Sequence, residues 1–300
     1  MPKIQFSKPP LDFDTQLRKL AATCQPSEKY ELGELLLKCS YYRVKSYLQP
    51  LRDPQNGTFS VEHLKSVMAF DHDLRLLILD SLETVEVYFR TVINEYMSNA
   101  TGDAFWYLNT DYFAKPDDHK ALIGTVREEY ARSREGFIVA YKKEYTMPPL
   151  SASHFAPDPS LPPSWMMIEI CSFGFFSRLY KALKTTYRKG IAQVFSLDEQ
   201  IVSSWFHALS VARNICAHHA RIWNRTLGVT PKTPNRDELF AAGDSSKVSV
   251  ILLILIRLLQ TIEENSGRQK SVIAFITGSS EYFQRKMGFY PKHIHRLRQI

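Results

Sequence analysis

The chain has 300 residues, of which 44% are hydrophobic and 23% are charged, a composition typical of a globular protein with ample material for a core. Its formal net charge of +7 suits a polyanionic partner such as a nucleic acid but does not require one. The cysteines are widely spaced and include no C-x-x-C pair, which argues against zinc and disulfide frameworks and predicts free thiols in a reducing cytosol: Cys24, Cys39, Cys171 and Cys216.

Neither a signal peptide nor a membrane span is expected. The N-terminus lacks the apolar stretch of a secretory signal. The most apolar run, residues 248–256, is interrupted at Arg257, well short of the roughly 20 residues that a span requires. We therefore expect a cytoplasmic protein without a membrane partner.

The first part of the chain has the apolar spacing of helices. Residues 28–50 predict one helix, whose tyrosines could stack on bases but are better explained as anchors in the core. Residues 58–70 predict a short helix with Ser60 as its cap. Residues 71–97 give the clearest pattern, because apolar side chains recur every three or four residues. This helix is expected to form the spine of a bundle, and Glu86 and Arg90 are spaced for an ion pair on it.

The later elements are also helical. Residues 105–108 indicate aromatic packing, and residues 117–145 indicate a charged, exposed helix. Residues 147–163 hold six prolines and predict a loop. Helices follow over residues 164–170, 179–195 and 248–262, with a bend at residues 173–174. The cations of residues 178–189 could follow a phosphate backbone or form a solvated face, and Ser196 with Glu199 predicts a capping box for the next helix.

No stretch shows the alternation of a strand, so the predicted fold class is all-α. We divide the chain into three parts: an N-terminal helical segment packing on the bundle (1–60), the helical bundle with its proline-rich loop (61–265) and a basic C-terminal helical tail (266–300).

Residues 205–225 concentrate polar side chains in one predicted helix. Apolar residues recur at helical spacing along one side: Ala208, Val211, Ile215 and Ile222. Since each residue turns an ideal helix by 100°, a polar ridge overlaps the edge of that stripe: Asn214, His218, Arg221 and Arg225. An ordinary surface helix keeps such groups away from its buried face, and this conflict points to function.

Arg213 and His218 fit the R-x4-6-H signature of the HEPN ribonucleases, with the polar Asn214 next to the arginine. Further landmarks occur in order: SYYR (40–43) with SY (46–47), FDHDLRL (70–76), EVYFRT (86–91), FWYL (105–108), SFG (172–174) and residues 213–225. Together they resemble the bacterial abortive-infection (Abi) family of the AbiD/AbiF type, a HEPN branch, over roughly residues 10–260. The resemblance implies a HEPN-like helical bundle with additional N-terminal and C-terminal helices.

Metal-free RNA cleavage needs a group that moves protons and a cation that stabilises the crowded phosphate. Histidine titrates near neutrality, and arginine offers a permanently charged fork. The resemblance then assigns His218 as acid or base, Arg213 as phosphate clamp and Asn214 as a positioning residue. It implies 2′,3′-cyclic phosphate products. We expect substrate-binding or orienting roles for neighbouring polar residues: His219, Arg221, Arg225, Glu86 and Arg90.

One regular helix cannot complete this site, because residues five apart differ by about 140° around the axis. Either the backbone departs from regular geometry, or a second copy of the motif supplies the missing groups. HEPN proteins usually form dimers, so the resemblance implies a homodimer with a composite cleft.

Other interpretations remain open at this point. A histidine within an apolar stripe is often a hydrogen-bonded core residue, and a zinc site from His207, His218 and His219 lacks suitable companions; no cofactor is expected. A metal-independent endoribonuclease in anti-phage defence or a toxin–antitoxin setting is favoured, with RNA as the partner and an antitoxin or non-coding RNA as a further one. The alternatives are a non-catalytic binder of structured RNA and a helical scaffold protein.

Overall fold

A computed structural model describes residues 9–51, 57–145, 161–234, 237–240, 244–263 and 267–300. The described residues contain no sheet, which confirms the all-α prediction. They form fourteen α-helices: α1 (Phe13–Ala21), α2 (Lys29–Lys38), α3 (Tyr41–Leu51), α4 (Val61–Thr101), α5 (Pro116–Arg132), α6 (Gly136–Glu144), α7 (Ser164–Ile170), α8 (Phe173–Ala182), α9 (Thr185–Val194), α10 (Glu199–Ala217), α11 (Val248–Ile262), α12 (Gly267–Gly278), α13 (Glu281–Met287) and α14 (Pro291–Leu297).

Helix α4 is the spine of the fold. Its 41 residues span about 60 Å at 1.5 Å per residue. Ser60 caps its start by accepting a hydrogen bond from the His63 N–H, and Gly102 ends it in the left-handed conformation. Two separate helices, residues 58–70 and 71–97, were predicted here. They are one helix, because no glycine or proline interrupts the chain between Ser60 and Gly102.

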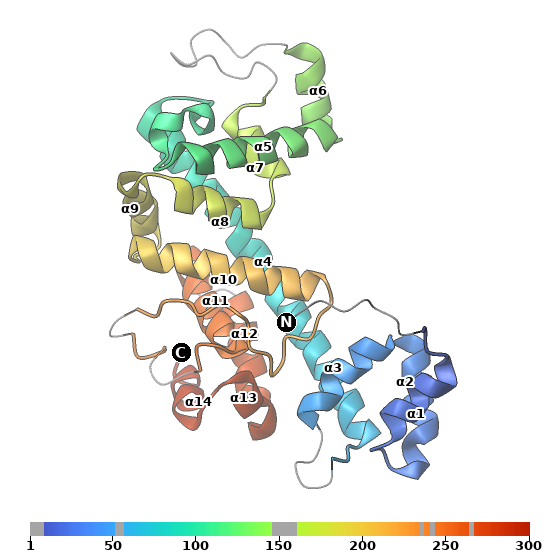
Figure 1. The fold of residues 1–300 in the computed structure, drawn as a ribbon. Helices are drawn as coiled ribbons and strands as arrows, with labels where there is room; N and C mark the ends of the chain where they lie inside the picture. The colour runs from blue at the N-terminus through green and yellow to red at the C-terminus, as the bar shows by residue number, and fades with distance from the viewer. Residues whose placement is uncertain (1–8, 52–56, 146–160, 235–236, 241–243, 264–266) are drawn as a thin grey trace, which may run out of the picture.

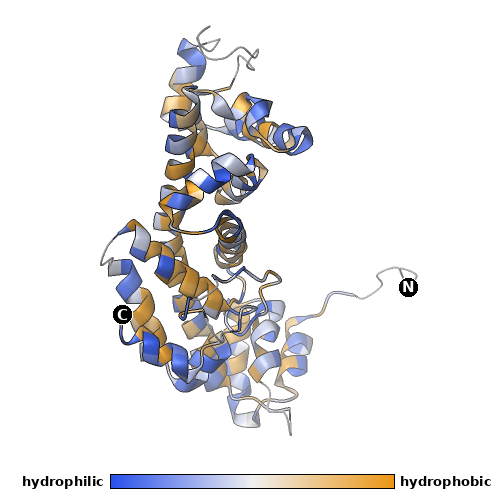
Figure 2. Ribbon diagram, turned by 90° about the vertical axis from the view of Figure 1, so that its left-hand side faces the viewer, coloured by the Kyte–Doolittle hydropathy of each residue, from blue (hydrophilic) through white to orange (hydrophobic). Residues whose placement is uncertain are grey.

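Helices α5, α8 and α10 lie one below another across α4 (Figure 1). The contact between α4 and α10 includes a stacked pair of buried rings, Phe89 and Phe206, with their centroids 3.4 Å apart. Hydrophobic residues lie mainly on the sides of the helices that face one another, and many hydrophilic residues lie on the outer sides (Figure 2). Helix α11 is buried along almost all of its length, as its apolar sequence predicts.

Several predicted helices are shorter than expected. Residues 28–50 divide into α2 and α3, because Cys39 is extended at the end of α2. Residues 117–145 divide at Ser133, which is also extended. The bend predicted at residues 173–174 lies earlier, where Ser172 caps α8. Helices α8 and α9 are separate because Leu183 and Lys184 are extended, and the Lys184 N–H donates to the Tyr112 carbonyl.

Other predictions about packing can be checked directly. Trp106 and Tyr107 are fully buried, which confirms the packing role of residues 105–108. All four cysteines are free thiols, but only Cys171 and Cys216 are buried. No helix of the described residues is long and apolar enough to cross a membrane. The proline-rich loop predicted at 147–163 lies almost wholly outside the described residues.

Candidate functional site

Helix α10 carries the residues singled out in the sequence and is fixed firmly at its start. Its cap is Asp198, whose carboxylate accepts a 2.8 Å hydrogen bond from the Gln200 N–H. The capping box predicted from Ser196 and Glu199 is wrong. Ser196 has a φ of 53°, which is not the extended conformation of a cap residue, and the buried Glu199 instead lies 3.6 Å from the Arg188 guanidinium.

The helix also ends earlier than predicted. Its last residue is Ala217, and His218 is the C-cap, whose N–H still donates to the Asn214 carbonyl at 3.0 Å. His219 then takes a φ of 56°, which turns the chain away. The prediction of one helix that runs to Arg225 is therefore wrong. Arg221 and Arg225 lie in the loop after α10 and not on a ridge of the helix.

Arg213, Asn214 and His218, hereafter the motif, lie at the surface at this end of α10. Asn214 and His218 are exposed, and Arg213 is half-buried. His218 is therefore not a core residue, although its apolar neighbours in the sequence suggested that it could be one. Because the helical hydrogen bond of His218 is intact, its side chain and that of Arg213 keep the wide angular separation of a regular helix.

The long helix α4 places Glu86 beside the motif. Burial raises the pKa of the Glu86 carboxyl, while the charges of Arg213 and Arg90 and a hydrogen bond from the Phe173 N–H act in the opposite direction. The structure thus brings Glu86 close enough for the charge of Arg213 to act on it. A half-buried carboxylate here offsets part of the positive charge of the motif.

Arg90 is turned toward another helix. Its guanidinium forms an ion pair with Glu169, 3.4 Å away, and donates to the Ile168 carbonyl of α7 at 3.3 Å. The ion pair that Arg90 makes in the described residues is therefore with α7, and not with Glu86 as predicted. Arg90 links α4 to α7 on this side of the bundle.

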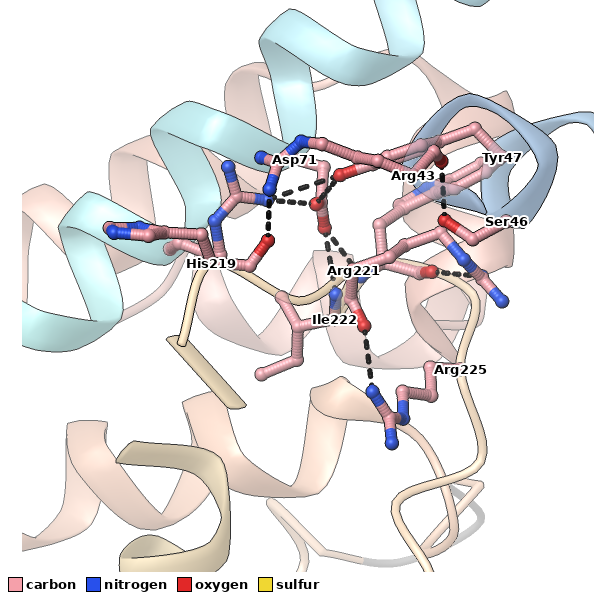
Figure 3. A network of polar contacts seen from close by, with 10 residues as sticks. Arg43, Ser46, Tyr47, Asp71, His219, Arg221, Ile222 and Arg225 are labelled. Atoms are coloured by element: carbon pink, nitrogen blue, oxygen red, sulfur yellow. Dashed lines mark hydrogen bonds and ion pairs between the residues drawn. The ribbon is translucent and has the colours of Figure 1, made fainter. Parts of the chain in front are cut away.

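A buried carboxylate, which the sequence reasoning gave no role, organises the loop after the motif (Figure 3). Asp71 of α4 is fully buried and forms an ion pair with Arg75, one turn later. It accepts hydrogen bonds from the Tyr47 hydroxyl at 2.5 Å and from the N–H groups of Ile222 and Trp223 at 3.0 and 2.7 Å. One carboxylate therefore joins α3, α4 and the loop.

Asp71 could have been suspected from the spacing of the sequence. Asp71 and Arg75 are four residues apart and in phase with the buried Leu74 and Ile78, so two charges fall on an apolar face. Buried charges need partners, and such a pair predicts a polar contact with another segment. Which segment supplies it depends on the tertiary fold.

The remaining basic residues of this region mostly hold backbone carbonyls. Arg43 of α3 donates to the His219 carbonyl at 2.7 Å, so it fixes the residue directly after the motif. Arg221 donates to the Trp223 and Asn224 carbonyls, and Arg225 reaches the Arg221 carbonyl. His219 itself is exposed. Of the predicted substrate-binding residues, Arg221 and Arg225 have donors already engaged with the loop, whereas the His219 side chain faces solvent.

The arrangement offers a cation, an amide and an imidazole at the surface, held by a rigid support. An arginine and an amide can bind an anionic oxygen, and an imidazole can accept or donate a proton. No three histidine, cysteine or acidic side chains gather in a metal-binding group within the described ranges.

Comparison with known protein families finds a match. The sequence model of a family described as Abi-like protein matches residues 34–224, more than half of the chain and a range that includes the motif and Asp71. No curated protein and no solved structure matches the chain.

Proposed function

The chain belongs to the Abi-like protein family, and from this premise we propose that it is a metal-independent endoribonuclease of the HEPN type. The family assignment supports a role in abortive infection. The AbiD/AbiF subtype, action on RNA and a cytoplasmic toxin–antitoxin or anti-phage setting with an antitoxin or non-coding RNA partner are the finer parts of the proposal.

The observation that carries the proposal is the exposure of the motif. His218 and Asn214 face solvent, on the side of α10 that lies opposite its buried residues. Polar side chains that only knit a bundle together would be expected to find partners inside it. These two are open to a ligand, and Arg213 beside them supplies a permanent positive charge.

In the proposed reaction a 2′-hydroxyl of RNA attacks the adjacent phosphorus, and the bond from phosphorus to the 5′-oxygen breaks. His218 takes the proton of the attacking hydroxyl or gives one to the leaving oxygen. Arg213 binds the non-bridging oxygens, where negative charge increases. Asn214 orients the phosphate. The products are a 2′,3′-cyclic phosphate and a 5′-hydroxyl.

A homodimer is part of the proposal, because one helix cannot direct Arg213 and His218 at the same phosphate. The backbone of α10 remains helical up to the His218 N–H and turns away only at His219, so the angle between the two side chains is not closed by local distortion. A second copy related by a twofold axis would bring the arginine of one chain to the histidine of the other.

The direct test is RNA cleavage by the purified protein in EDTA. We expect cyclic-phosphate products, no reaction at a 2′-deoxy linkage, and a loss of about 10²- to 10⁴-fold in His218→Ala, with unchanged circular dichroism and RNA affinity. His295→Ala is the matched control, since His295 is an exposed histidine of α14. Salt-sensitive RNA binding without cleavage would favour a non-catalytic binder, and cleavage that survives in His218→Ala would refute the assignment of that residue.

A further inference from the structure

A groove lies between α8, α9 and α10, outside the motif. It has a volume of about 490 Å³, and every residue that lines it is polar or charged. The lining includes Arg178 and Lys181 of α8, His207 of α10 and Lys232. We call it the α8–α10 groove. A cavity lined by polar and charged residues offers several hydrogen-bond donors and positive charges to a hydrated or anionic ligand.

The charge of this groove is only partly compensated. Glu199, its one acidic lining residue, already pairs with Arg188. Arg178 and Lys181 are exposed and pair with no carboxylate in the part of the chain that the structure describes. Both also line a second hollow of about 670 Å³ between α5 and α8. The two side chains therefore form a basic ridge between two hollows, where an anionic chain could lie across α8.

The walls of the groove are rigid. The buried Tyr180 hydroxyl donates to the carbonyls of Arg188 and Glu199, which ties α8 to α9 and α10. Arg188 donates to the Lys181 carbonyl and to the Thr185 hydroxyl. A site built this way loses little conformational entropy when a ligand binds, because its supports are already in place.

The groove and the motif share one face of α10. At 100° per residue, four polar side chains lie within about 60° of one another around the axis: Ser203, His207, Asn214 and His218. Ser203 and His207 line the groove, and Asn214 and His218 belong to the motif. His207 and Asn214 are about 10 Å apart along the helix axis. In a nucleic acid double helix, one strand places about three phosphates in that length.

We propose that the α8–α10 groove is a second phosphate-binding site, which holds the backbone of the same RNA strand a few nucleotides from the scissile phosphate. Arg178 and Lys181 contact phosphate oxygens, and His207 and the serine hydroxyls of the lining donate hydrogen bonds. This inference rests on the proposed function for the identity of the ligand. Its main experiment measures binding, and a cleavage assay then separates the two proposals.

The test is the salt dependence of binding to a short single-stranded RNA that carries 2′-O-methyl groups and so cannot be cut. In Arg178→Ala/Lys181→Ala, the slope of log affinity against log salt should become shallower by about 0.7 for each lost phosphate contact. The control is Arg134→Ala/Lys143→Ala, which removes the same two charges from exposed positions of α6 and its N-terminal flank. The charge-keeping double variant Arg178→Lys/Lys181→Arg should retain the native slope.

Cleavage of a dinucleotide, which is too short to reach the groove from the motif, separates the two proposals. The groove is supported if Arg178→Ala/Lys181→Ala cuts the dinucleotide at the native rate and has the shallower slope. A slope equal to that of the α6 control overturns the groove, even if cleavage is intact. Loss of dinucleotide cleavage in the double variant overturns a separate site. Native protein that binds this RNA but cuts neither a dinucleotide nor a longer RNA with free 2′-hydroxyl groups overturns the nuclease and leaves the slopes to decide the groove.

Discussion

Two polar clusters lie at the C-terminal end of α10, and they differ in what their side chains meet. Around Asp71, the carboxylate, the Tyr47 hydroxyl and the Arg75 guanidinium are buried and bonded to one another or to the loop (Figure 3). In the motif, Asn214 and His218 are exposed. The first cluster is a support whose side chains bond to one another and to the loop, and the second keeps its side chains available. Polar side chains at the same end of α10 thus have opposite roles.

Removal of the Asp71 carboxylate tests the difference between the two clusters most directly. Asp71→Ala leaves Arg75 buried without its ion-pair partner, which should lower the free energy of unfolding by about 3–5 kcal/mol. Urea denaturation followed by circular dichroism measures the loss. Asp73→Ala, an exposed aspartate two residues later, is the control, and His218→Ala should also be close to native stability. Equal losses in Asp71→Ala and His218→Ala would show that the two clusters do not differ in this way.

A second experiment asks whether the motif is completed by another copy of the chain. Arg213→Ala and His218→Ala proteins should each be inactive, but mixing them should restore about one quarter of native cleavage, since half of the random dimers have one intact pair. Cleavage rates after co-refolding of equal amounts measure the recovery. A mixture as inactive as its parents would contradict a site shared between two chains.

Arg43 connects the two clusters, because its guanidinium donates a hydrogen bond to the carbonyl of His219, the residue directly after His218. Arg43→Ala should cost about 1 kcal/mol in unfolding free energy, the usual net value of one hydrogen bond. It should also slow cleavage, because His218 loses part of its support. Lys45→Ala, an exposed cation on the same helix, controls for charge. If Arg43→Ala alters RNA affinity but neither stability nor rate, the residue contacts RNA instead.

The smallest expected effect concerns Glu86, whose raised pKa makes its ionisation unfavourable in the folded chain. A carboxyl with a raised folded pKa contributes stability below its ordinary value of 4.5, and this contribution is lost as the pH rises past the folded pKa. Relative to native protein, Glu86→Gln should therefore become more stable between acidic and neutral pH. Thermal unfolding across that range measures the trend, with Glu83→Gln as the exposed control. A trend of opposite sign would mean that Arg213 outweighs burial.

Helical spacing predicts most of the fold because it depends on local sequence. The spine, the buried α11 and the all-α class follow from apolar residues at every third or fourth position. The helix ends are less predictable, since long-range bonds determine some of them. Nothing local marks Ala217 as the last residue of α10, and the loop beyond it is held by Asp71, Tyr47 and Arg43 from far away in the chain.

The sequence allowed the residues of the candidate site to be named, but not their exposure to solvent or their position relative to the end of α10. The pair Arg213 and His218 could be picked out from spacing and resemblance, and Glu86 could be placed near them. Periodicity alone put His218 in an apolar stripe, and only the fold shows that its side chain faces solvent. The roles of Arg221 and Arg225 in the loop also depend on where the helix stops.

The bonds from Asp71 to Ile222 and Trp223 join residues 151 and 152 positions apart in the chain. During synthesis, α3 and α4 leave the ribosome long before the loop that they hold, so the end of α10 cannot be fixed until residue 223 has emerged. A partial chain that already contains Arg213 and His218 lacks the support that holds them. We therefore expect the end of α10 to become ordered in a nascent chain only after translation has passed the loop.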